Sequence, residues 1–263
     1  MDTSVLHAGS AASQLEAALK KKAETYDQLS GEYHSARFHD EPGRFDLQEG
    51  RRMVLELATK LMRDRGNSWR ALDVACGSGK VAIPLAALGG RVVALDAAPG
   101  MLKQVHTNAT REGVRLQLLQ SGANAIPYPD GVFDMVFSFR FLHLFARSHH
   151  ATLIREMTRV TKPGGFVVLE FNNSLYGVVL NYLNDRLQSR RGKTEFSSAY
   201  SLFGVRSLAH QIPGLHFRAA YGLLLPKAWL LAPSNFLTRC AHGLARTPLK
   251  ATAHFLVVVY QKL

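Results

Sequence analysis

The chain has 263 residues, of which 47% are hydrophobic, and it carries a formal net charge of +12. This length and composition fit one large globular domain with a sizeable core, and no apolar run reaches the roughly 18 residues that span a bilayer. The sequence begins without a basic stretch followed by an apolar core, and its two cysteines are far apart, so we expect a reduced, cytoplasmic protein.

Periodic apolar residues predict helices over residues 13–29 and 47–65. Short apolar strands then alternate with helices, which is typical of a parallel sheet buried on both faces. The predicted strands are residues 71–75, 91–96, 115–120, 133–139 and 165–171, and the helices between them are residues 79–88, 99–112 and 148–160. Beyond this alternation, residues 172–215 look helical, and two more strands are predicted over 215–225 and 254–263.

The excess of positive charge lies in the last third of the chain. Residues 172–263 hold 11 Lys and Arg against 2 Asp and Glu, whereas residues 1–171 hold 21 against 18. This imbalance indicates an anionic substrate, an acidic carrier protein or a membrane surface as partner, and a solvated basic face explains it about equally well.

The motif LDVACGSGKVA (72–82) places a glycine turn between the first strand and a helix. It is not an ATP-binding P-loop, because Val74 and Val81 stand where that loop needs a glycine and a hydroxyl side chain. Gly77, Gly79 and Ala82 do satisfy the spacing of a dinucleotide-binding turn.

Two acidic residues narrow the choice of ligands that this turn can bind. Asp96 ends the next strand, where a carboxylate binds ribose hydroxyls. Asp73, four residues before Gly77, would repel a pyrophosphate and attract a cationic amino-acid ligand. The pair therefore favours S-adenosylmethionine, which has no phosphate, although Asp73 could also be a helix cap or part of a structural ion pair.

At this point the chain resembles the class I S-adenosylmethionine-dependent methyltransferases of the small-molecule branch, with a short likeness to the quinone-biosynthesis enzymes in VVLEF. Four segments carry the resemblance, namely LDVACGSG (72–79), VVALDAAPGML (92–102), IPYPDGVFDMVFSFRFLHLF (126–145) and VTKPGGFVVLEF (160–171). The resemblance implies a Rossmann-like, doubly wound, mostly parallel seven-stranded sheet with an antiparallel C-terminal strand and a helical cap.

The resemblance also implies the cofactor contacts. Asp73 would lie near the cofactor ammonium, Asp96 would accept both ribose hydroxyls, and Met101 would pack on the adenine unless it is ordinary helix core. Arg37 would pair with the cofactor carboxylate or form a surface ion pair. The expected cofactor-binding residues are Tyr33, Arg37, Asp73, Ala75, Gly77, Gly79, Asp96, Ala97, Met101, Ala123, Asn124 and Phe139.

The sequence departs from the family at the adenine edge. Gly122 stands where the family has an acid, so the carboxylate that accepts from the adenine amino group is missing. The amide of Ala123 can still donate to the ring, and Asn124 is a candidate for the lost acceptor.

His143 follows the fourth strand and is the best candidate for a general base, with a structural histidine as the alternative. No metal site is expected. We predict four regions: an N-terminal helical lid (1–46), a cofactor-binding core (47–171), a helical cap insertion (172–215), and the end of the sheet with a second apolar cap segment (216–263).

The predicted function is transfer of a methyl group to the oxygen or carbon of a small, lipophilic or anionic acceptor in biosynthesis. An RNA methyltransferase that uses the basic last third, an NAD-dependent oxidoreductase, and a scaffold without catalysis are the alternatives. No segment resembling an RNA-binding domain accompanies the core, which makes nucleic acid the weaker partner.

Overall fold

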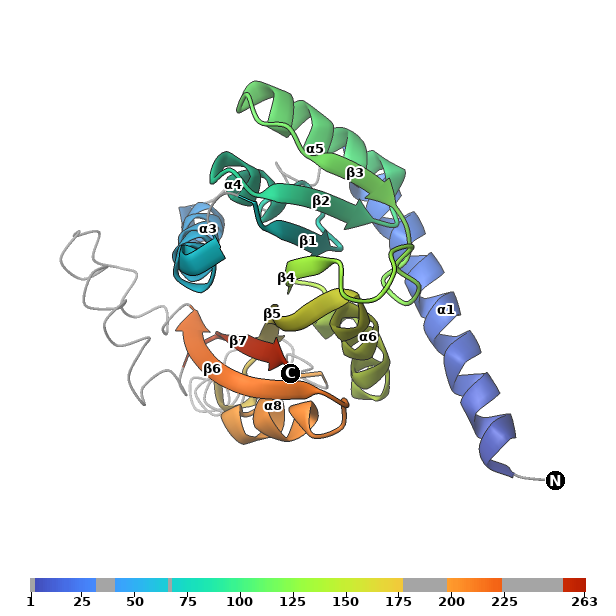
Figure 1. The fold of residues 1–263 in the computed structure, drawn as a ribbon. Helices are drawn as coiled ribbons and strands as arrows, with labels where there is room; N and C mark the ends of the chain where they lie inside the picture. Colours follow the sequence, from blue (N-terminus) through green and yellow to red (C-terminus); the bar gives the residue numbers. More distant parts are fainter. Residues whose placement is uncertain (1–2, 32–40, 66–67, 177–197, 224–252) are drawn as a thin grey trace, which may run out of the picture.

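The computed structural model describes residues 3–31, 41–65, 68–176, 198–223 and 253–263 (Figure 1), with side chains for all of these except residues 3–10, 41–50 and 223. Within this part of the chain, seven strands form one sheet in the order β3-β2-β1-β4-β5-β7-β6. The strands are β1 (Arg70–Val74), β2 (Arg91–Asp96), β3 (Gln117–Gln120), β4 (Phe133–Ser138), β5 (Thr161–Asn172), β6 (Leu215–Leu223) and β7 (Phe255–Lys262).

Strands β1 to β5 pair in parallel, whereas β7 runs antiparallel to both of its neighbours, β5 and β6. Phe255, the first residue of β7, lies opposite Asn172 at the end of β5 and opposite Leu223 at the end of β6. The reversed strand therefore brings its beginning to the edge where the parallel strands end. This topology confirms the predicted mostly parallel, seven-stranded fold class.

Helices cover both faces of the sheet (Figure 1). The helices are α1 (Thr3–Leu29), α3 (Glu41–Leu61), α4 (Ala82–Ala87), α5 (Pro99–Arg111), α6 (Arg147–Val160) and α8 (Leu202–Ala209), with short 3-10 turns η1 (Arg63–Arg65) and η2 (Leu142–Leu144). Side chains of α3, α4 and α5 share one apolar core with one face of the strands, and those of α1, α6 and α8 share the other.

The alternation of side chains along a strand explains the two cores. Leu72 and Val74 of β1 lie in the core with α6, while Ala71 of the same strand lies in the other core, with α3 and α4. Because both faces are covered, every residue of β1 after Arg70 is buried, which is why the strand reads as a continuous apolar run broken by Asp73.

The predicted elements are found with shifted ends. The first helix starts at Thr3 instead of residue 13, and the helix expected from Gly79 starts at Ala82, because Gly79 has a φ of +86° that a helix cannot contain. Strand β5 starts at Thr161, four residues early. Of the predicted helical region 172–215, the structure describes α8, and residues 177–197 lie outside the described residues. The four-part division of the chain stays a prediction.

Candidate functional site

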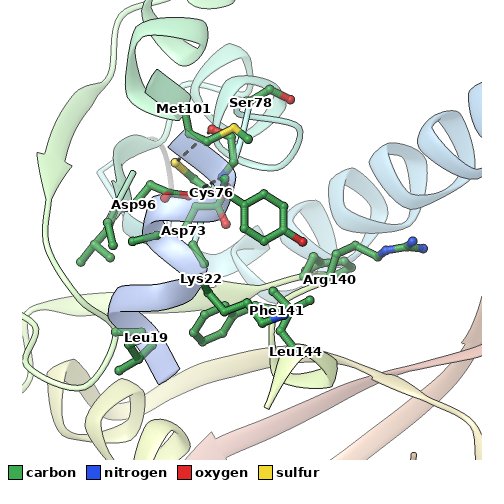
Figure 2. A pocket seen from close by; sticks show the side chains of 18 of the residues that line it. Leu19, Lys22, Asp73, Cys76, Ser78, Asp96, Met101, Arg140, Phe141 and Leu144 are labelled. Atoms are coloured by element: carbon green, nitrogen blue, oxygen red, sulfur yellow. Dashed lines mark hydrogen bonds between the residues drawn. The ribbon is translucent and has the colours of Figure 1, made fainter. Parts of the chain in front are cut away.

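Strands β1, β2 and β4 end at one cavity, which Figure 2 shows from close by. The glycine loop after β1, the segment after β4 and helix α1 all contribute residues to its lining. The lining residues are Leu19, Lys22, Ala23, Tyr26, Asp73, Ala75, Cys76, Gly77, Ser78, Lys80, Val81, Leu95, Asp96, Ala97, Met101, Ser121, Ala123, Phe139, Arg140, Phe141, Leu144 and Phe145.

The loop after β1 turns sharply because three of its residues have positive φ. These are Ala75 at 57°, Gly77 at 52° and Gly79 at 86°. The amide of Cys76 donates to the Leu95 carbonyl of β2 at 3.0 Å, and the Gly79 amide donates back to Cys76 at 3.0 Å. The loop is thus closed on itself and fixed to the neighbouring strand.

The two glycines of this loop serve different purposes. A Cβ at Gly77 would meet no atom within 4 Å, so this glycine leaves the backbone open to a ligand. A Cβ at Gly79 would come within 2.9 Å of Ile83 and 3.2 Å of Val105, so this glycine lets α4 and α5 pack on the loop. Gly79 does not line the cavity, and its predicted cofactor contact stays a prediction.

Asp73 is a buried carboxyl at the end of β1, and 2% of its surface is exposed. Its Oδ2 accepts a hydrogen bond from the Ala82 amide at 3.0 Å. Burial raises the pKa of Asp73 to about 8, with a smaller rise from the charge of Asp96, and the Ala82 hydrogen bond offsets part of this. A carboxyl with this pKa is well suited to a cationic ligand, which would stabilise the ionised form.

Asp96 at the end of β2 is held by two backbone amides. Its Oδ2 accepts from Gly77 and its Oδ1 from Ala98, each at 2.9 Å. Burial raises the pKa of Asp96, and these amide hydrogen bonds oppose the rise. Each oxygen keeps a further lone pair, so the carboxylate can accept two hydroxyl groups from one ligand.

Helix α1 crosses the cavity and contributes Leu19, Lys22, Ala23 and Tyr26 to its wall (Figure 2). Its last turn is fastened to α5, because Asp27 Oδ1 accepts a hydrogen bond from the Gly100 amide at 2.6 Å.

Helix α5 has no side-chain cap of its own, since its N-cap residue is Ala98. The carboxylate of Asp27 therefore caps α5 from another helix. The fit requires glycine, because a Cβ at Gly100 would lie 2.3 Å from Ser30 Oγ.

The opposite end of the cavity is lined by Met101, Ser121 and Ala123. Gly122 has no side chain, and a Cβ there would lie only 2.7 Å from the amide oxygen of Asn124. An acceptor oxygen therefore already occupies the space beside Gly122. Asn124 itself does not line the cavity.

The segment after β4 is aromatic. Phe139, Phe141 and Phe145 line the cavity, and the rings of Phe141 and Phe145 meet edge to face with centroids 5.0 Å apart. His143 lies in η2 between them but does not line the cavity, and its carbonyl accepts a hydrogen bond from Ser198 Oγ at 3.1 Å. Its role as general base stays a prediction.

The cavity brings together most of the predicted contact residues. Those that line it are Asp73, Ala75, Gly77, Asp96, Ala97, Met101, Ala123 and Phe139, whereas Gly79, Asn124 and His143 do not. Tyr33 and Arg37 lie outside the described residues. Leu19 and Lys22 line the cavity although their positions carry no motif. Arg140 lines it from the segment 126–145 that carries the resemblance, where it was not among the predicted contacts.

No group of histidine, cysteine, aspartate and glutamate in the described ranges is arranged to hold a metal ion. None of the helices described is long and apolar enough to cross a membrane.

Comparison with known proteins agrees with this geometry. Residues 71–165 match the family model described as "Methyltransferase domain". Over 108 residues the chain is 40% identical to demethylmenaquinone methyltransferase from Thermus thermophilus, and over 102 residues it is 37% identical to an uncharacterised protein from Mycobacterium tuberculosis. These alignments cover 39% of this chain in both cases, and 47% and 36% of the respective relatives, so the chain matches less than half of their length.

Among solved structures, magnesium protoporphyrin IX methyltransferase from Synechocystis with bound S-adenosylhomocysteine superimposes with a TM-score of 0.61. The superposition covers 85% of this chain and 88% of that enzyme, at 12% sequence identity. It shows a shared fold across most of the chain, while the sequence alignments above cover 39% of it.

Proposed function

We propose that the chain transfers a methyl group from S-adenosylmethionine to a small molecule, because residues 71–165 match a methyltransferase domain and surround the cavity described above. The acceptor is lipophilic or anionic, and an oxygen or carbon atom receives the methyl group. The 40% identity to a quinone methyltransferase over the shared region supports a lipophilic acceptor.

The observation that carries the proposal is the pair of buried carboxyls beside the glycine loop. Asp73 and Asp96 face one cavity, and burial raises the pKa of both. These groups favour a cationic ligand over the pyrophosphate of NAD, because an ammonium stabilises the ionised form of Asp73, whereas a pyrophosphate would keep Asp73 protonated and gain no attraction from it. They fit a ligand with an ammonium group and a ribose.

The lining residues can be assigned to the parts of the cofactor. Asp73 binds the ammonium, Asp96 accepts the ribose hydroxyls, and the side chain of Met101 packs on the adenine. The amide of Ala123 donates to the adenine ring. The Asn124 oxygen, which lies beside Gly122 although Asn124 is not among the lining residues, is our candidate for the acceptor that is absent at Gly122. The bound cofactor supplies a sulfonium methyl group that a nucleophile can attack in line.

The protein's own part in the reaction is alignment and exclusion of water. Phe139, Phe141 and Leu144 form an apolar side of the cavity that favours a dry approach of the acceptor. Where the acceptor must lose a proton, we assign that step to His143. This residue directly precedes Leu144 in the chain, although it does not itself line the cavity. A membrane surface or an acidic carrier protein as the source of the acceptor, and a cytoplasmic location, belong to the same proposal.

Calorimetry with S-adenosylmethionine, S-adenosylhomocysteine and NAD tests the proposal. We expect binding of the first two and none of NAD, with loss of affinity in Asp96→Ala and no loss in Asp64→Ala, an exposed acid away from the cavity. Incubation with cofactor carrying a labelled methyl group and a small-molecule extract then identifies the acceptor. Binding of NAD alone would refute the proposal.

A further inference from the structure

Arg140 has an unusual backbone for its residue type. It comes two residues after the end of β4, lines the cavity and has a φ of 57°. A side chain in this left-handed region strains the backbone, and glycine would remove the strain. Strain of this kind persists where the surroundings hold the residue, and it concentrates at ligand sites. The arginine side chain is therefore the feature to explain.

Two neighbours hold the guanidinium in place. Its central carbon lies 4.7 Å from the ring centroid of Phe255, and Nε lies 3.9 Å from Oε1 of Glu170. The side chain of Glu170 is 5% exposed, whereas that of Arg140 is 39% exposed. At 3.9 Å the carboxylate is beyond hydrogen-bond distance, and within the described residues neither Nη group donates a hydrogen bond. The guanidinium is oriented but keeps its planar pair of donors.

The position of the guanidinium separates it from the donor end of the cavity. Glu170 and Phe255 belong to β5 and β7, while Asp73 and Asp96 belong to β1 and β2 on the other side of β4. Neighbouring strands are about 4.8 Å apart, so β1 and β7 are separated by roughly 14 Å. Figure 2 shows the Arg140 side chain pointing away from Asp73 and Asp96.

This separation argues against the cofactor carboxylate as the partner of Arg140. The carboxylate and the ammonium of S-adenosylmethionine are attached to the same carbon atom. If Asp73 binds the ammonium, the carboxylate stays near β1 and does not reach the guanidinium beyond β4.

We propose that Arg140 binds a carboxylate on the methyl acceptor, and that Phe139 and Phe141 contact the apolar body of the same molecule. The proposal rests on the methyltransferase function above and narrows its acceptor to a carboxylate attached to an apolar skeleton. The planar fork of an arginine matches a carboxylate with two parallel hydrogen bonds, which a lysine does not offer. Arg140 is then a specificity-determining residue of the acceptor site.

Binding of benzoate and benzamide to the full-length protein tests the assignment, because the two probes share a ring and differ in charge. Dissociation constants are measured by ligand-observed NMR, with and without S-adenosylhomocysteine. We expect wild-type protein to prefer benzoate by about tenfold or more, as a charge-assisted pair allows. Arg140→Asn, which tolerates positive φ, should remove the preference, and Arg140→Lys should retain part of it.

Arg206→Gln is the matched control, because Arg206 also lies over an aromatic ring, that of Phe217, but does not line the cavity. It should leave the preference intact. Equal binding of the two probes to wild-type protein, or a preference that survives in Arg140→Asn, would overturn the assignment.

A parallel loss of S-adenosylhomocysteine affinity in Arg140→Asn would place the arginine on the donor and also overturn it. Failure of the methyltransferase function itself has a separate signature, since the wild-type protein would then bind no S-adenosylhomocysteine.

Discussion

Cofactor binding should release a proton from Asp73. The pKa of this buried carboxyl is raised to about 8, so at pH 7 most molecules carry it protonated. An ammonium ligand stabilises the ionised form and lowers the pKa, because opposite charges attract strongly in a buried site. The proton leaves as the ligand enters. Affinity for such a ligand therefore rises with pH up to about 8.

The size of this pH dependence follows from the fraction of protein molecules in which Asp73 is ionised and can bind the ammonium. With a pKa of about 8, Asp73 is ionised in about 9% of molecules at pH 7 and about 1% at pH 6. At pH 8 about half of the molecules carry Asp73 ionised, so the fraction that is competent to bind falls about 50-fold between pH 8 and pH 6.

Calorimetry with S-adenosylhomocysteine measures this dependence, because the product keeps the ammonium and lacks the reactive methyl group. Titrations at pH 7 in phosphate and in Tris, which differ in ionisation enthalpy, give the number of protons released, expected to be about 0.9. Methylthioadenosine is the control ligand, since it has the ribose and adenine but no amino acid part. Any proton that Asp96 releases on binding is released with both ligands, so it cancels when the two ligands are compared.

Asp73→Asn supplies the protein control. It should bind S-adenosylhomocysteine weakly at every pH and lose the difference between the two ligands. A wild-type affinity that is flat from pH 6 to 8, with no proton release at pH 7, would refute the reasoning about Asp73. So would an Asp73→Asn variant that keeps both the affinity and the pH dependence.

Three further predictions concern other parts of the site and the core. Asp96→Ala should weaken binding of both S-adenosylhomocysteine and methylthioadenosine by about tenfold or more in calorimetry, and an unchanged affinity for the second ligand would contradict the ribose assignment. Gly79→Ala should lower the free energy of unfolding in urea by about 1–3 kcal/mol more than Gly77→Ala, because only the first overpacks the core, whereas Gly77→Ala should mainly weaken ligand binding. Burial lowers the pKa of His150 below 6.5, so the unfolded chain binds the proton first and the melting temperature should fall as the pH drops below 6.5; a His150→Gln variant with the same slope would exclude this cause.

The parallel half of the fold could be predicted because strands that are buried on both faces appear in the sequence as short, continuous apolar runs. Strand β2 was predicted at its observed bounds, since RVVALD is apolar until the carboxylate that ends it. The same reasoning located Asp73 and Asp96, because a charged residue that ends a buried strand faces the edge where ligands bind. Both residues line the cavity.

The remaining parts of the site depend on contacts between distant segments. The periodicity of α1 predicts a helix, but nothing in it shows that Lys22 lines the cavity or that Asp27 caps a helix 73 residues away. The left-handed backbone of Arg140 could not be predicted from the sequence either, because positive φ is expected mainly at glycine and asparagine. Gly79 was predicted to contact the cofactor, and the structure shows in addition that the absence of a Cβ at Gly79 makes room for Ile83 and Val105.

The reversal of β7 bears on how this fold diversifies. Because β6 ends and β7 begins at the same edge as β4 and β5, the connection between residues 223 and 255 leaves and rejoins the sheet beside the acceptor end of the cavity. Both ends of that connection lie at the edge of the sheet, away from the strands that carry Asp73 and Asp96. Exchanging this one segment between related chains therefore tests whether it affects the choice of the acceptor proposed above without altering the cofactor-binding strands.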